Sequence, residues 1–177
     1  MAVMKEFRTP ADFWSGMVEP DFEDLLSNPA DLRAAFHAAI SLFHMHDWVW
    51  KSDEARVRAI FNVRKAKAEA ADFADALESQ YPDFGRVRGV ANAAKHLELR
   101  PSSVRPVTNA PRHAANTFVQ VMGGGGGYGV AGAYGKGEWG YASAPRVVLE
   151  GSTDIPFSDV AKAVYQMWET LGAAHGW

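Results

Sequence analysis

NPADLRAAFHAAISLFHMHDWVWK, residues 28–51, is the stretch that decides the fold, because it predicts a long and mostly buried helix. Asn28 can cap this helix, Pro29 suits its first position, and Asp31 complements the positive end of the helix dipole. At a helical period of about 3.6 residues, most of its circumference is apolar. The sequence therefore predicts a helix from residue 29 to about residue 50.

Further helices are expected to pack against this one. SDEARVRAIFNVRKAKAEAADFADALESQ, residues 52–80, contains many good helix formers and almost no breaker, so we expect one continuous helix. FGRVRGVANAAKHLEL, residues 84–99, has apolar residues at helical spacing along one face. Near the N-terminus, Thr9 can cap a short helix with Pro10 in its first turn, and PDFEDLL predicts a second short segment. Three packed antiparallel helices follow from this pattern.

Beyond residue 100 the pattern changes. TFVQVM and RVVLEG predict two strands on either side of a glycine-rich segment, and PFSDVAKAVYQMWETLG predicts a helix that Gly172 can end. We therefore expect an α+β fold, an antiparallel helical bundle of three to four main helices with a small antiparallel glycine-rich β-sheet or hairpin before a C-terminal helix. The chain should form a single domain, 1–177, with the bundle in 1–100, the loop and small sheet in 101–155 and the C-terminal helix in 156–173.

The glycine-rich segment raises the question of a nucleotide site. Its GYGVAG, residues 127–132, matches the GxGxxG pattern, in which the motif opens a helix whose N-terminal amides meet a pyrophosphate. Here AYGKGEWGY follows, and each glycine in it would cost a helix about 1 kcal/mol relative to alanine. We therefore expect no dinucleotide, and interpret the segment as a hairpin, a flexible connection or a lid over a ligand.

Charge and composition limit the class of protein. The net charge of −3 hides a basic middle, because residues 51–113 contain twelve Lys or Arg against eight Asp or Glu. Such clusters can attract phosphates, or they can simply solvate helix faces. The absence of Cys excludes disulfides and thiolate metal sites. With no signal-peptide pattern and no long apolar run, we expect a cytoplasmic protein without membrane association.

Polar groups on the helix of residues 29–50 suggest a site. Asp47 lies within an apolar arc, where a lone carboxylate would cost several kcal/mol, so we expect it to be neutral or paired, and His44 lies one turn earlier as a partner. The apolar arcs enclose a narrow polar stripe, which contains Arg33, His37, Ser41, His44, Trp48 and Lys51.

The helix of residues 84–99 offers partners for this pair. The side opposite its apolar face contains Arg88, Asn92, Lys95 and His96. If this side meets His44 and Asp47, a general base, an orienting acid and cationic groups come together. In the alternative, Asp47 only satisfies His44 or a backbone donor, and the four polar residues face water.

A metal site is a third option. It would use His37, His44, Asp47 and His96. Metal sites in helical bundles usually take a Glu-x-x-His pair from more than one helix, a pattern that is missing here. No metal and no other cofactor is therefore expected.

FHMHDWVW followed by VANAAKHLEL resembles bacterial helical proteins that have Asn-x-x-Lys-His on a late helix, and more distantly the HEPN superfamily. The resemblance covers residues 29–100. It implies a helical bundle and, as in many members, a metal-independent ribonuclease that uses an Arg and a His of one helix. Asn92, Lys95 and His96 match best, whereas Arg88 and His96 are further apart than the family's pair, and the glycine-rich segment has no counterpart.

Together these features predict a small RNA-directed protein. Its most specific form is a ribonuclease in which His96 is the general acid or base and Arg88 or Lys95 stabilises phosphate charge. One alternative is a non-catalytic binding module that forms a homo-oligomer through its long helices or exposed aromatic side chains. The other is a metal-dependent or small-molecule enzyme.

Overall fold

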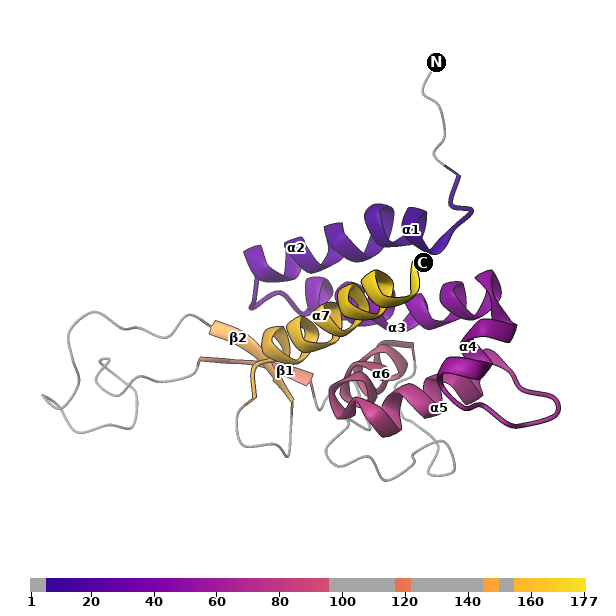
Figure 1. Ribbon diagram of the computed structural model, residues 1–177. Helices are drawn as coiled ribbons and strands as arrows, with labels where there is room; N and C mark the ends of the chain where they lie inside the picture. Colours follow the sequence, from indigo (N-terminus) through magenta and orange to yellow (C-terminus); the bar gives the residue numbers. More distant parts are fainter. Residues whose placement is uncertain (1–5, 96–116, 122–144, 150–154) are drawn as a thin grey trace, which may run out of the picture.

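The computed structural model describes residues 6–95, 117–121, 145–149 and 155–177, and in it the helices surround α3, Leu32–Ser52. α3 contacts helices α1, α2, α5, α6 and α7. Figure 1 shows α1 and α2 on one side of α3 and α7, with α5 and α6 on the other. The helices around α3 are α1 (Pro10–Phe13), the π-helical turn η1 (Trp14–Val18), α2 (Glu19–Ser27), α4 (Glu54–Ile60), α5 (Ala70–Gln80), α6 (Pro82–Lys95) and α7 (Phe157–His175).

α3 begins later than predicted, because the residue expected to cap it closes the preceding helix instead. The Asn28 backbone N–H and side-chain amide both donate to the Asp24 carbonyl at the end of α2. Asp31 is the cap of α3, and its carboxylate accepts from the backbone N–H of Arg33 at 2.8 Å. Pro29 therefore lies in a turn and not in the first position of the helix.

The prediction of one continuous helix over residues 52–80 is wrong. α4 ends at Ile60, and Asn62 has a φ of 54°, the left-handed conformation in which helices commonly end. α5 begins only at Ala70, after a capping box formed by Glu69 and Asp72. The break turns the chain so that the ring of Phe61 packs against that of Phe73 in α5, with centroids 4.8 Å apart. Both aromatic side chains are thereby buried.

The predicted α+β class is also wrong, because helices make up the body of the protein. Apart from two five-residue strands, the described residues are 79% helical. β1 (Thr117–Val121) and β2 (Pro145–Leu149) form an antiparallel pair, in which β1 contacts α3 and β2 contacts α7. The predicted glycine-rich hairpin, GYGVAG at 127–132 included, lies outside the described residues.

The first and last helices show one cap that was predicted and one that was not. Thr9 caps α1 as expected, and its hydroxyl accepts from the backbone N–H of Asp12 at 3.1 Å. α7 continues through Gly172, so the predicted end there is wrong. It ends at His175 and is capped by Gly176, whose φ of 70° suits glycine and whose N–H donates to the Gly172 carbonyl at 2.7 Å.

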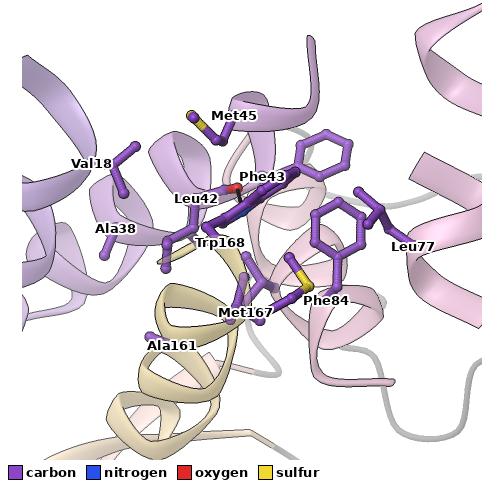
Figure 2. Close-up of a cluster of buried hydrophobic side chains, with 14 of the residues drawn as sticks. Val18, Ala38, Leu42, Phe43, Met45, Leu77, Phe84, Ala161, Met167 and Trp168 are labelled. Carbon is purple, nitrogen blue, oxygen red and sulfur yellow. Dashed lines mark hydrogen bonds between the residues drawn. The ribbon is translucent and has the colours of Figure 1, made fainter. Parts of the chain in front are cut away.

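The core lies where α3, α6 and α7 meet, and Figure 2 shows part of it. The indole of Trp168 on α7 is buried, and its Nε1–H donates to the Leu42 carbonyl of α3 at 3.0 Å. Phe84 of α6 meets the Trp168 ring edge-on at 6.0 Å and the Phe43 ring at 5.9 Å. These contacts fix one side of α3, and the opposite side faces α1 and α2.

Candidate functional site

A pocket of about 550 Å³ lies between α3 and the first helices of the chain. Its size falls in the range of small-molecule sites, and its walls are largely apolar, as is usual for them. The described residues that line it are Phe13, Met17, Asp21, His37, Ile40, Ser41, His44, Asp47, Trp48 and Lys51.

The lining residues form two facing stripes at helical spacing. Those of α3 recur every three or four residues from His37 to Lys51, so they share one face of that helix. Those of the first helices are Phe13, Met17 and Asp21, at intervals of four residues. Phe13 stacks on Trp48 at one end, and Asp24 lies 3.7 Å from Arg33 at the other. The two stripes therefore run antiparallel, and the pocket extends along α3.

A π-helical turn forms part of the pocket wall. In η1 the backbone N–H of Glu19 donates to the carbonyl of Trp14, five residues earlier, which widens the helix by one residue. Val18 of this turn is fully buried, whereas Met17 lines the pocket. Single π-helical turns are rare and often occur at functional sites. This turn is therefore a second observation, independent of the pocket, that points to the same place.

Two aromatic rings line one end of the pocket, and a third packs against them. Phe13 and Trp48 stack with centroids 5.0 Å apart, and Phe7 meets each of them edge-on at 6.4 Å. Phe7 reaches this position because it passes over Gly16, where an added Cβ would lie 2.1 Å from the Phe7 ring. The glycine thus permits the close approach of the segment before α1.

The predicted pair of His44 and Asp47 is confirmed, and it lies in the pocket wall. The Nδ1–H of His44 donates to a carboxylate oxygen of Asp47 at 2.8 Å, and both side chains are 33% exposed. This hydrogen bond lowers the pKa of Asp47 below its usual value, so the carboxylate is ionised at neutral pH. The arrangement is that of a base oriented by an acid.

His46 is a member of this group that the sequence analysis missed. Its side chain is buried, its Nδ1–H donates to the Phe43 carbonyl, and its Nε2 lies 3.6 Å from the second carboxylate oxygen of Asp47. Burial lowers the pKa of His46, so the ring is neutral at physiological pH. The sequence HMHD contained the signal, because residues 44 and 46 project on either side of residue 47 on a helix.

The structure does not place Arg88 in the pocket wall with His44 and Asp47. The Arg88 guanidinium donates to Asp75 at 2.8 Å and to Glu78 at 2.9 Å, both on α5, and lies 5.9 Å from the centre of the Phe43 ring. Two carboxylates thus compensate its charge, and it ties α6 to α5. Arg88 therefore gives no support to the arrangement in which the polar side of α6 would meet His44 and Asp47.

The structure says less about the other candidate site residues on α6 than about Arg88. Asn92 lies on α6 and is half-buried. Lys95 is the last described residue of that helix; its side chain and all of His96 lie outside the described residues. Among the residues that the structure describes, no group of three or more His, Asp or Glu side chains is arranged to hold a metal ion.

No protein-family model, curated protein or solved structure matches the chain. The resemblance to the HEPN superfamily therefore stays a prediction. In the described ranges, no helix is both long and apolar enough to cross a membrane.

Proposed function

We propose that this protein binds a small organic molecule in the pocket between α3 and the first helices. The observation that carries the proposal is the pocket itself, since a volume of about 550 Å³ with mostly apolar walls and a few grouped polar side chains is typical of such sites. The π-helical turn η1 supports the same location.

The walls favour a ligand with a flat apolar body and one polar group. Trp48 and Phe13 offer aromatic surface at one end, and Met17 and Ile40 add aliphatic surface. The polar group of the ligand would meet the His44–Asp47 pair, which lies between these apolar contacts.

That the protein binds or cleaves RNA stays a prediction, and it has less support than ligand binding. Of the two cations proposed to stabilise phosphate, Arg88 is held by two carboxylates. The side chain of the other, Lys95, and all of His96 lie outside the described residues. Cleavage of RNA that is lost in His96→Ala and insensitive to chelator would restore it, and the absence of RNA binding at low salt would end it. Self-association is likewise a prediction that light scattering of the purified protein would test.

The pocket can be tested with the fluorescent probe 1-anilinonaphthalene-8-sulfonate, whose rings suit the described walls. Met17→Trp places a bulky ring in the pocket, so we expect the affinity for the probe to fall at least tenfold. Leu26→Trp is the matched control, because Leu26 is an apolar residue of the next helix that does not line the pocket. Leu26 is 51% exposed and Met17 39% exposed. Equal affinity in both variants, or no saturable binding to the wild-type protein, would contradict the proposal.

A further inference from the structure

We propose that the pocket selects a ligand with an ammonium group, and that the carboxylate of Asp21 binds this group at one end of the pocket. The apolar body of the ligand would extend from there to Phe13 and Trp48 at the other end. This inference rests on the proposed function, because it names the class of molecule that the same pocket would hold, a primary amine with an apolar body.

Asp21 shares one face of the first helices with Phe13 and Met17. The three residues follow at intervals of four, so they form a row along the pocket. Asp21 is eight residues after Phe13, which corresponds to about 12 Å of helix. Because the two stripes run antiparallel, Asp21 lies toward His37, whereas Phe13 stacks on Trp48 at the other end. The carboxylate and the aromatic surface are therefore separate contact points for one elongated ligand.

The Asp21 carboxylate is a charge that no other described residue compensates. The residue is half-buried and lines the pocket, and it has no hydrogen-bond or ion-pair partner in the described part of the chain. The guanidinium of Arg33, on α3, lies 3.7 Å from Asp24 and 4.0 Å from Asp31, so two other carboxylates already share this cation. A half-buried carboxylate without a partner favours a cation from the ligand.

The second carboxylate of the pocket differs from Asp21, because it has partners. Asp47 is hydrogen-bonded to His44 at 2.8 Å, and its pKa is lowered chiefly by this hydrogen bond and further by nearby charges, which include Lys51. His37 is the remaining titratable side chain of the described lining, and it makes no ion pair with Asp21. The uncompensated negative charge among the described lining residues is therefore at the Asp21 end.

A primary amine matches this arrangement in charge and in shape. Alkylamines are protonated at neutral pH, as the side chain of lysine is. An ammonium group carries three N–H donors and accepts nothing, so it suits a carboxylate and no other charged group of the wall. The apolar walls between Asp21 and Phe13 include Met17 and Ile40, which suit a hydrocarbon chain.

The test compares two probes that differ in charge, 4-phenylbutylamine and 4-phenylbutan-1-ol, by calorimetry at neutral pH and low salt. They have the same ring and the same chain, and both can donate a hydrogen bond to a carboxylate, but only the amine is charged. We expect the wild-type protein to bind the amine about tenfold more tightly than the alcohol. Added salt should reduce this preference, because it screens the attraction between the ammonium and the carboxylate.

Asp21→Asn should abolish the preference for the amine and leave the affinity for the alcohol nearly unchanged. Glu23→Gln is the matched control, because Glu23 is an exposed carboxylate of the same helix and does not line the pocket. It removes the same charge from the protein, and the preference for the amine should persist in it. Far-UV circular dichroism of each variant verifies that the helices are retained.

The outcomes separate this inference from the proposed function. Equal affinity of the wild-type protein for the two probes would overturn the inference and leave ligand binding intact. A preference that persists in Asp21→Asn, or that is lost in Asp47→Asn instead, would place the ammonium elsewhere and overturn it as well. A parallel loss of affinity for the alcohol in Asp21→Asn would assign the effect to the shape of the pocket and not to charge, which also overturns it. No saturable binding of the amine, the alcohol or the fluorescent probe to the wild-type protein would overturn both proposals.

Discussion

Trp168→Phe is predicted to weaken the protein where α7 joins α3. Trp168 is 2% exposed, and its indole N–H makes the buried hydrogen bond to the Leu42 carbonyl at 3.0 Å. That carbonyl also has a partner within α3, since helical geometry pairs it with the amide four residues on, so the variant leaves no acceptor unsatisfied. The loss is therefore the net value of one hydrogen bond, about 1 kcal/mol, and not a full desolvation penalty.

The smaller ring adds a packing term to this loss. Phenylalanine lacks the part of the indole that corresponds to roughly two buried methylene groups, at about 0.8 kcal/mol each. The sum is roughly 2–3 kcal/mol, a large share of the roughly 5–15 kcal/mol by which most domains are stable. It should lower the urea midpoint by about 1 M or more, with an unchanged slope.

The assay is urea unfolding followed by circular dichroism, since six tryptophans complicate fluorescence. Trp14→Phe is the control. Its Nε1–H also makes a 3.0 Å hydrogen bond, to Glu19, but the contact is only partly buried and lies within one short stretch of chain. We expect a loss of less than about 1 kcal/mol there. Similar losses in the two variants, or a loss below about 1 kcal/mol for Trp168→Phe, would refute the account of the α3–α7 junction.

Three further predictions concern single residues. Because burial lowers the pKa of His46, the unfolded chain takes up a proton on this ring at a higher pH than the folded protein does. The free energy of unfolding should therefore be full above about pH 6.5 and fall below it by at most about 1.4 kcal/mol per pH unit. His46→Phe should remove this slope in urea titrations at several pH values. The hydrogen bond to His44 lowers the pKa of Asp47, so the pair stabilises the folded protein above about pH 4 and loses this contribution on further acidification. In Asp47→Asn the melting temperature should fall less steeply with acidification below about pH 4. An unchanged fall would contradict the pairing. Asn62 has a φ of 54°, so Asn62→Gly should change the free energy of unfolding by only a few tenths of a kcal/mol, whereas Asn62→Ala should lower it by about 1 kcal/mol. Equal losses in the two variants would argue against the left-handed turn.

Local signals in the sequence were sufficient for several elements. The Thr9 cap and the apolar period predicted α1 and most of α3, and the pairing of His44 with Asp47 followed from their spacing on one helix. The break between α4 and α5 did not follow, because it depends on the left-handed turn at Asn62 and on burial of Phe61 against Phe73. Propensity alone favours a continuous helix there, and tertiary packing overrides it.

The pocket is a tertiary feature and could not be predicted in the same way. It exists because the first helices pack antiparallel on α3, with Phe13 on Trp48, and because the π-helical turn shifts the register around Met17. The polar stripe on a mostly buried helix was the sequence signal for this face. The polar side of α6 was only one candidate partner for this face, and its Arg88 pairs with Asp75 and Glu78 of α5.

The most direct test of the account is nuclear magnetic resonance of the protein with 1-anilinonaphthalene-8-sulfonate bound. The account predicts intermolecular NOEs from the aromatic protons of the probe to the Met17 methyl group, the Trp48 indole and the His44 ring, which line one pocket from two helices. NOEs only to residues of α5 and α6, or none to the three predicted groups under saturating probe, would contradict it.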